Sequence, residues 1–253
     1  MSLMQMRLND MKYDFIDLPW DTEYFGVKSG KVVINEEIEL HDIKEIIRLA
    51  EAYEFITINN INNQPLNNFL IGKYTNAFIV DTNVQFEMNV QHKKGENYFD
   101  AMDTYKKNID LIKIAENSFN FSRFYNDPFL NIQLSKQLYS NWINNSFSKK
   151  EKYFIVAEVN EEILGYLLFS FNKSDALTIE LISLDKTAQG KGIGTKLLDS
   201  LVYFAGNNNI HKIKVGTQID NLQAINFYMK KGFSLSSKSS IYHFWPRKEL
   251  LND

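Results

Sequence analysis

The chain has 253 residues, a formal net charge of −3, 44% hydrophobic and 23% charged residues, and no cysteine. This length allows one large domain or two small ones with a packed core. The small negative charge offers no basic face to nucleic acid, and the lack of cysteine excludes disulfides, thiolate zinc sites and cysteine nucleophiles.

No stretch of the sequence is typical of a membrane span or a targeting signal. The longest apolar run, Ile163 to Phe171, is too short to cross a bilayer. Met1 to Asp10 lacks the apolar segment of a signal peptide. We therefore expect a cytoplasmic protein with no membrane partner, no nucleic-acid partner and no metal. No internal repeat is evident in the sequence.

The first hundred residues predict a small α/β half with its own core. The expected elements are a turn at Leu18–Gly26, a strand at Val27–Ile34, a helix at Asp42–Tyr53 capped by Asp42, a strand at Phe55–Ile58, a helix at Pro65–Lys73 and strands over Phe78–Val90 with a turn at Asp81–Asn83. The polar segment Gln91–Asn108 is the best linker. It separates an expected N-terminal domain, residues 1–100, from a second domain, residues 109–253.

The second half predicts a longer series of strands and helices. The expected elements are a strand at Ile109–Ile114, a helix with Leu134, Leu138, Tyr139, Trp142 and Ile143 on one face, a hairpin of Phe154–Val159 and Ile163–Phe171 with its turn at Asn160–Glu162, and strands at Leu177–Leu184, His211–Ile219 and Ser240–Trp245. In Leu177–Leu184 the apolar phase slips by one residue, from 177, 179 and 181 to 182 and 184. A β-bulge would cause this slip, and so would a strand buried on both faces.

A glycine-rich turn, Gln189 to Gly194, follows that strand and precedes a helical pattern. Backbone N–H groups at such a helix start form a ready anion site, and glycine lets backbone approach a phosphate closely. The spacing is neither a dinucleotide-binding fingerprint nor a P-loop. The alternative is a tight strand-to-helix connection that binds no ligand.

A second motif, Asn221, Ala224 and Tyr228, falls at positions i, i+3 and i+7 of the next predicted helix. This spacing puts an amide and a phenol on one helix face. Leu222, Ile225 and Met229 are then expected to face the core, and Gly232 to end the helix in a left-handed conformation. The alternative is an ordinary amphipathic helix with Asn221 as its cap.

Together the two motifs resemble the GNAT N-acetyltransferase superfamily over roughly residues 109 to 245. The resemblance implies an α/β (α+β) acyltransferase fold with a mixed, splayed central sheet, here preceded by the smaller α/β domain. It also implies acetyl-CoA as co-substrate, with Tyr228 as proton donor to the CoA thiolate. The cofactor-binding residues that it implies are Ile182, Ser183 and Leu184 along the pantetheine arm, Gln189, Gly190, Lys191, Gly192, Ile193, Gly194 and Thr195 around the pyrophosphate, and Asn221 on the arm.

Several short segments resemble one branch of this superfamily, the TDP-fucosamine acetyltransferases. They are Leu18–Asp21, Ser122–Phe124, Trp142–Asn145, Val215–Gln218 and the ending with Tyr242. This likeness implies transfer of an acetyl group to the amino group of a nucleotide-linked deoxyamino sugar, with Arg123 and Gln218 as substrate-binding residues. Phe227 departs from the branch, which carries an arginine there, so some contact to CoA is expected to differ.

Arg123 has two interpretations of its own. Its planar guanidinium is suited to clamp a phosphate or carboxylate. Alternatively, it braces its loop through Asp127 and stacks on an aromatic ring.

The general base and the acceptor stay open at this stage. Glu180 and His243 are candidate bases, and water or the ionisation of the substrate itself would also serve. Three functions remain: a sugar-nucleotide N-acetyltransferase, an N-acetyltransferase for a peptide N-terminus or another small amine, and a non-catalytic acyl-CoA-binding module. The expected partner is a small-molecule amine, with a homodimer as a further option.

Overall fold

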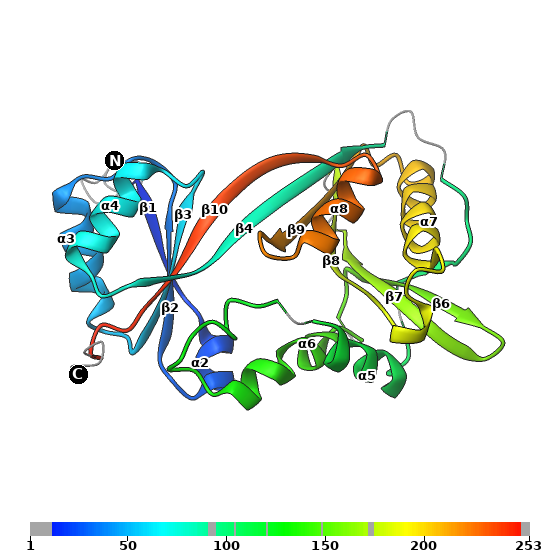
Figure 1. The fold of residues 1–253 in the computed structure, drawn as a ribbon, viewed down its shortest axis with the longest axis horizontal. Helices are drawn as coiled ribbons and strands as arrows, with labels where there is room; N and C mark the ends of the chain where they lie inside the picture. The colour runs from blue at the N-terminus through cyan, green and yellow to red at the C-terminus, as the bar shows by residue number, and fades with distance from the viewer. Residues whose placement is uncertain are drawn as a thin grey trace, which may run out of the picture. The chain divides into compact units, whose positions relative to one another are not determined.

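The structure, a computed structural model, describes residues 12–90, 95–103, 105–119, 121–147, 149–171 and 175–248 (Figure 1). Expectations for Met1–Asp10 and for His92–Lys94 lie outside these residues. The chain divides into two compact units. Unit 1 comprises Met1–Asn83, Arg123–Leu134 and Ser237–Asp253, and unit 2 comprises Val84–Ser122 and Ser135–Ser236.

These units differ in outline from the two consecutive domains expected from the sequence. Unit 1 includes a segment from the middle of the chain and another from its end. The division into residues 1–100 and 109–253 stays a prediction, because compactness is not a measure of independent folding.

Unit 1 is an α/β layer built on three whole strands and parts of two more. Its elements are β1 (Tyr13–Asp17), α2 (Pro19–Phe25), β2 (Ser29–Ile34), α3 (Leu40–Ala50), β3 (Phe55–Ile61), α4 (Pro65–Tyr74), the start of β4 (Phe78–Asn89) and the end of β10 (Ser234–Phe244). β2 pairs antiparallel with β1 and parallel with β3, and β10 pairs antiparallel with β3. Apolar residues of α3 and α4 pack with Ile56, Ile58 and Phe244 on one face of these strands, while α2 lies on the other (Figure 1).

Three local predictions for unit 1 were wrong. The segment after Leu18 is the helix α2, because Pro19 is suited to the first helical position and Gly26 ends the helix with φ of 69°. The cap of α3 is Glu39, and Asp42 completes a reciprocal capping box by accepting from the Glu39 N–H at 2.8 Å. The expected turn at Asp81–Asn83 is absent, since β4 runs unbroken through it.

Unit 2 holds the longer strands. Its elements are β5 (Ala101–Met102), α5 (Ile109–Ser118), α6 (Ile132–Ser146, which begins in unit 1), β6 (Lys152–Val159), β7 (Glu162–Ser170), β8 (Ala176–Leu184), the 3₁₀ turn η1 (Lys186–Ala188), α7 (Ile193–Asn207), β9 (Lys212–Gln218) and α8 (Leu222–Lys230). The hydrogen-bonding order of the whole mixed sheet is β1-β2-β3-β10-β4-β9-β8-β7-β6-β5. The mixed α/β fold expected from the sequence is thereby confirmed.

Two predictions for unit 2 had opposite outcomes. The β6–β7 hairpin is confirmed, and its turn residues Asn160 and Glu161 both take positive φ, at 52° and 66°. The strand expected at Ile109–Ile114 is wrong, because this segment is the start of α5. The Asn108 side chain caps that helix by accepting from the Asp110 N–H at 2.8 Å. A short run that alternates apolar and polar residues did not reveal the helical period that buries Leu111, Ile114 and Ala115.

The two units share an order of elements that the sequence did not reveal. In each, an antiparallel strand pair leads through a helix to a parallel strand, then through a second helix to a long strand. In unit 1 the series is β1, β2, α3, β3, α4 and β4, and in unit 2 it is β7, β8, α7, β9, α8 and β10. The repeat is therefore one of topology, present although the two sequences have diverged.

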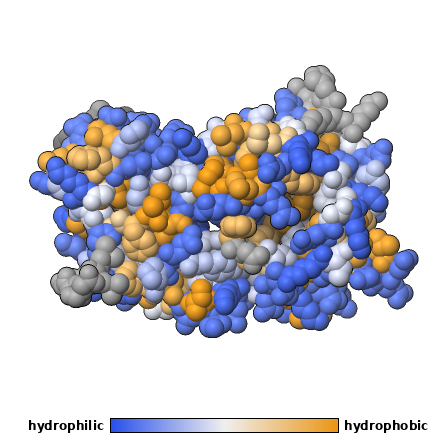
Figure 2. Space-filling model, viewed as in Figure 1, coloured by the Kyte–Doolittle hydropathy of each residue, from blue (hydrophilic) through white to orange (hydrophobic). Residues whose placement is uncertain are grey.

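Hydrophobic and hydrophilic residues are interspersed on the face drawn in Figure 2. Among the described residues, no helix combines the length and the hydropathy that a bilayer span needs.

Candidate active site

In unit 2 the parallel strands β8 and β9 separate part of the way along. They pair from Ala176 with Lys212 to Ile179 with Val215, yet β8 continues to Leu184 and β9 to Gln218. In unit 1 the corresponding strands β2 and β3 stay paired along the whole of β2. An opening between the ends of two parallel strands is a usual ligand position in α/β sheets.

A β-bulge marks the place where the two strands separate. Against β7, Leu181 pairs with Leu168 and Ile179 pairs with Phe169, so Glu180 between them has no partner on β7. The bulge predicted from the slipped apolar phase is confirmed, one residue earlier than the slip suggested. After it, Ile182 and Leu184 pack against the unit 2 core, while the buried Ser183 alternates to the other face.

The glycine-rich turn leads into α7 with its backbone in the conformation that glycine permits. Gly190 and Gly192 have φ of 74° and 79°, and Gly192 is the residue before the first helical position. The first hydrogen bond of α7 runs from the Lys196 N–H to the Gly192 carbonyl at 3.1 Å. Within the described part of the chain, the N–H groups of Ile193–Thr195 meet no acceptor. Three convergent N–H groups and the positive end of the helix dipole suit a phosphate.

This turn lies close to the strand opening and to α8. A Cβ placed on Gly194 would meet Leu184 at the end of β8 and the ring of Phe227 on α8, each at 3.7 Å. Phe227 is the residue at which the sequence departs from the TDP-fucosamine branch. An apolar ring therefore lies beside the start of α7, where that branch has a cation.

Asn221 is the cap of α8. Its Oδ1 accepts from the Ala224 N–H at 3.1 Å, and its own N–H donates to the Gln218 carbonyl at 3.0 Å. The capping interpretation of Asn221 is thus confirmed, and its Nδ2 has no hydrogen-bond partner among the described residues. Gln218 ends β9 at the separated strand pair, so the strand end and the helix start are joined at this point.

Tyr228 lies on the buried face of α8, and of the three residues that we had assigned to the core only Ile225 packs there with it. It is 4% exposed, whereas Leu222 and Met229 are 65% and 59% exposed, so the expectation for those two residues was wrong. Its ring packs near those of Phe86, Phe227 and Phe233, with centroids 5.5 to 6.1 Å away. The predicted helix end is confirmed at Gly232, with φ of 87°.

The Tyr228 hydroxyl is buried and protonated. It forms no hydrogen bond to another described residue. Burial raises the pKa of Tyr228 well above its usual value of 10.0. The phenol is therefore protonated at neutral pH.

The bulge residue Glu180 is held by two partners. One carboxylate oxygen forms an ion pair with Lys152, and the other accepts from the Trp142 indole N–H at 3.2 Å. The Glu180 side chain is 9% exposed and that of Lys152 is 23% exposed. A half-buried carboxylate with both oxygens engaged is anchored in place and poorly placed to accept a proton.

Arg123 belongs to unit 1, whereas the other expected site residues belong to unit 2. Its guanidinium carbon lies 4.2 Å from the centroid of the Phe124 ring, as the stacking interpretation expected. Asp127 accepts from His243 Nδ1 at 2.6 Å and from the Trp245 indole at 3.0 Å. The candidate base His243 is thus buried within unit 1, with a carboxylate on one nitrogen.

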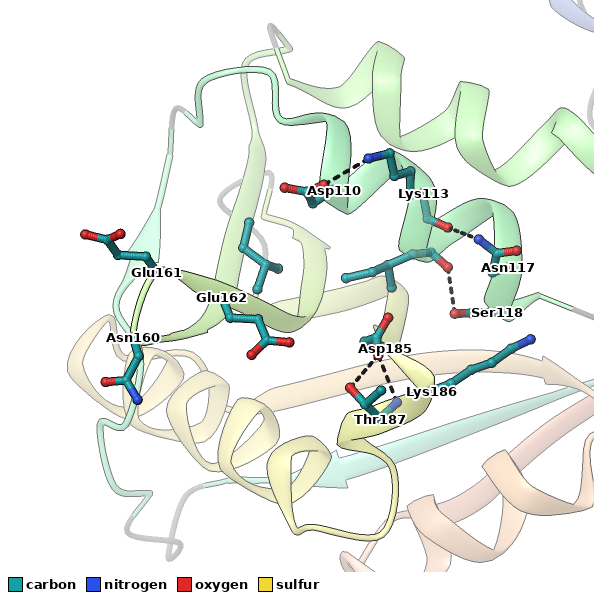
Figure 3. A pocket seen from close by; sticks show the side chains of 12 residues that line it. Asp110, Lys113, Asn117, Ser118, Asn160, Glu161, Glu162, Asp185, Lys186 and Thr187 are labelled. Carbon is teal, nitrogen blue, oxygen red and sulfur yellow. Dashed lines mark hydrogen bonds and ion pairs between the residues drawn. The ribbon is translucent and has the colours of Figure 1, made fainter.

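An open cavity of about 710 Å³ lies elsewhere in unit 2, between α5, the β6–β7 turn and η1 (Figure 3). Most of its lining residues are polar, and Asp110 with Lys113 and Asp185 with Thr187 already form local pairs on its wall. None of the expected cofactor residues lines it. The Ser118 hydroxyl in its lining donates to the Leu184 carbonyl at 3.4 Å. We therefore locate the candidate site at the strand opening. In the described residues no group of three His, Asp or Glu side chains could hold a metal ion.

Comparison with known proteins shows what this part of the chain is similar to. Residues 117–233 match the Acetyltransferase (GNAT) family. The chain is 30% identical over 139 residues to the spore coat polysaccharide biosynthesis protein SpsD of Bacillus subtilis, a match that covers 55% of this chain and 48% of SpsD. The chain thus spans about half the length of this curated relative.

Two solved structures share the fold. A GCN5-related N-acetyltransferase from Sphaerobacter thermophilus superimposes with a TM-score of 0.58 at 12% identity, over 94% of this chain and 77% of that one. A tandem GNAT protein from the clavulanic acid biosynthesis pathway gives a TM-score of 0.59 at 11% identity, over 87% and 76%. At these identities the likeness establishes the fold alone.

Proposed function

We propose that the protein is an acetyl-CoA-dependent N-acetyltransferase, because residues 117–233 match the acetyltransferase (GNAT) family. We propose further that its acceptor is the amino group of a nucleotide-linked deoxyamino sugar. The observation that carries the first proposal is the separation of β8 from β9 directly beside the glycine-rich start of α7. The spore coat polysaccharide function in the name of SpsD supports the second.

The residues of the opening fit acetyl-CoA. The N–H groups from Gly190 to Thr195 would receive the pyrophosphate, with Gln189 and Lys191 flanking them. The separated segment Ile182–Leu184 offers backbone groups to the pantetheine arm, and Asn221 offers its Nδ2 hydrogens. The helix dipole would add about 0.3–2 kcal/mol to the binding of the phosphates, so most of the affinity must come from contacts along the arm.

In the proposed reaction the neutral amine attacks the thioester carbonyl. A C–N bond forms and the C–S bond breaks, while backbone N–H groups of β8 stabilise the negative charge on the carbonyl oxygen. The Tyr228 phenol donates its proton to the departing thiolate sulfur. Burial keeps the Tyr228 phenol protonated before the thiolate forms, which this role requires.

The amine must lose one proton, and neither candidate base is well placed to take it. Glu180 is engaged by Lys152 and Trp142, and His243 is buried with Asp127. We therefore propose that the amine binds in its neutral form or gives its proton to water. Gln218, at the open end of β9, is proposed to contact the acceptor, and the substrate-binding role of Arg123 stays a prediction.

A release assay for the CoA thiol tests the function. We expect turnover with a thymidine- or uridine-diphosphate 4-amino-4,6-dideoxy sugar, and little turnover with a peptide N-terminus or with simple amines. Turnover that is equal or better with peptides would support the alternative amine acceptor and contradict the sugar. Tight acetyl-CoA binding without turnover on any amine would make the protein a non-catalytic acyl-CoA-binding module.

Two further expectations concern the location of the protein and its oligomeric state. A cytoplasmic location agrees with a sequence that contains no cysteine and hence needs no oxidising compartment. A homodimer remains an option, which sedimentation of the purified chain decides.

A further inference from the structure

The bulge of β8 carries a side chain that the ladder with β7 does not use. Ile179 and Leu181 each pair with a residue of β7, whereas Glu180 between them has no partner there. At such a bulge one strand holds an extra residue and bends. The pairing of β8 with β9 ends at Ile179, directly before the bulge. The residue that leaves the ladder therefore stands where the opening between β8 and β9 begins.

The apolar pattern of β8 does not by itself choose the bulged register. In the structure Ile182 and Leu184 pack against the unit 2 core, while Leu181 and Ser183 lie on the other face. Without the bulge these two pairs of residues would exchange faces, because successive side chains of a strand alternate. Each face would receive at least one aliphatic side chain in either register. Hydrophobic burial alone therefore specifies the register of this strand only weakly.

Polar contacts from two other elements hold Glu180 outside the ladder. One carboxylate oxygen forms an ion pair with Lys152 on β6, and the other accepts from the Trp142 indole N–H on α6 at 3.2 Å. The Glu180 side chain is 9% exposed, so these two donors replace most of the water that the carboxylate has lost. The extra residue of the bulge is thus tied to a strand and a helix that are not its ladder neighbours.

The register without a bulge would take the carboxylate away from these donors. Residue 180 would then occupy the ladder position of Leu181, opposite Leu168 on β7. Leu168 in turn pairs with Phe154 on β6, and both of these side chains are fully buried. A carboxylate in this apolar row would have to remake its contacts or lose them. The contacts with Lys152 and Trp142 therefore favour the bulged register.

Unit 1 shows the same arrangement of strands without a bulge. Its antiparallel pair β1–β2 keeps one register from Tyr13 with Ile34 to Asp17 with Gly30. The parallel strand β3 stays paired along the whole of β2. In unit 2 the corresponding antiparallel ladder shifts, and the parallel pair separates. Bulge and opening thus occur together, which supports the bulge as the cause of the opening.

We propose that Glu180, Lys152 and Trp142 form an anchor that holds the bulge and thereby keeps β8 and β9 apart. Glu180 is then a positioning residue for acetyl-CoA and takes no part in proton transfer. Without the anchor β8 would continue its register beside β9, which places Leu181 next to Thr217 and closes the opening. The inference rests on the proposed acetyl-CoA site, and it gives Lys152 a role that the sequence had not suggested.

Hydrogen exchange of the full chain without ligand, followed by mass spectrometry, tests the anchor. We expect the backbone amides of Glu180–Leu184 to exchange at least about tenfold more slowly in Glu180→Leu and Lys152→Met, because renewed pairing with β9 would protect them. Lys152→Arg keeps the charge and should stay within about threefold of the wild type. Lys212→Met breaks the more exposed ion pair with Glu87 in unit 2, and as the matched control it should stay in the same range.

Calorimetric titration with acetyl-CoA connects the anchor to the proposed site. The Kd for acetyl-CoA should rise at least about tenfold in Glu180→Leu and Lys152→Met, because the closed strands would exclude the thioester arm. It should stay within about threefold of the wild type in Lys152→Arg and Lys212→Met.

The direction of the exchange effect separates an anchor from a general contribution to stability. Exchange over Glu180–Leu184 that is unchanged or faster in both variants would overturn the anchor, because loss of a merely stabilising contact exposes amides instead of protecting them. If Glu180→Leu does not fold, Lys152→Met decides. Slower exchange with an unchanged Kd supports the anchor and contradicts the cofactor site at this opening. A wild-type chain that binds no acetyl-CoA contradicts the proposed function, and the exchange measurement still decides the anchor.

Discussion

Replacing Tyr228 by phenylalanine should separate catalysis from folding and cofactor binding. The ring keeps its contacts with Phe86, Phe227 and Phe233, and the lost hydroxyl makes no hydrogen bond to a described residue. We therefore expect the melting temperature and acetyl-CoA affinity to stay near wild type. Loss of a general acid should lower kcat by roughly 10²–10⁴, which corresponds to about 3–5 kcal/mol in activation free energy.

Tyr166→Phe is the matched control for this change. Tyr166 on β7 is another fully buried tyrosine of unit 2, and its hydroxyl has no partner in the described structure. Removing this hydroxyl should leave kcat unchanged and should stabilise the fold by about 1 kcal/mol, because an unsatisfied buried group is lost. Stopped-flow or steady-state measurement of thiol release gives kcat, and unfolding in urea gives the free energy of unfolding. An undiminished kcat in Tyr228→Phe would refute the proton-donor role, and equal losses in both variants would trace the effect to core packing.

The remaining predictions concern the helix cap, acid stability and stoichiometry. Asn221→Asp keeps the acceptor for the Ala224 N–H but loses the amide donor, so the free energy of unfolding should hold while the KM for acetyl-CoA rises. Asn221→Ala loses the acceptor as well and should also lower the free energy of unfolding in urea by about 0.5–2 kcal/mol. The pKa of His243 is lowered to about 4 from 6.5, so its contribution to stability is present above pH 6.5 and is lost as the pH falls toward 4. By linkage this contribution amounts to about 3 kcal/mol in the free energy of unfolding. The decrease in the free energy of unfolding from pH 7 to pH 4.5 should therefore be smaller in His243→Asn than in the wild type. Calorimetric titration should give one bound acetyl-CoA per chain. A second bound acetyl-CoA would contradict our inference that only unit 2 has an opening for it.

How much of this site the sequence could predict depends on how far apart along the chain the interacting residues lie. The bulge, the glycine turn and the helix cap at Asn221 are local features, because their chemistry is set by neighbours a few residues away. The core face of α8 was predicted correctly for Ile225 and wrongly for Leu222 and Met229, since periodicity shows that two faces differ but not which one meets the core. Leu222 and Met229 are apolar yet exposed, and only tertiary packing decides that.

Contacts between residues that lie far apart along the chain could not be predicted from the sequence. Trp142, Lys152 and Glu180 stand on three different elements, and only the fold brings them into contact. No local pattern marks Lys152 as a partner of Glu180. The same applies to Asp127, which we had considered as a brace for Arg123 and which instead holds His243 and Trp245.

The comparison of the two units indicates why we propose the acetyl-transfer site in only one of them. Both place a strand, a helix and a parallel strand in the same order, so topology alone does not create a cofactor slot. In unit 1 the strands remain paired, and Glu39 and Asp42 already satisfy N–H groups at the start of α3. A phosphate there would meet carboxylates instead of free N–H groups. In unit 2 the bulge at Glu180 opens the strands and glycine leaves the N–H groups of α7 exposed. Strand separation and an uncapped helix start are both needed, because the first admits the thioester arm and the second holds its phosphates.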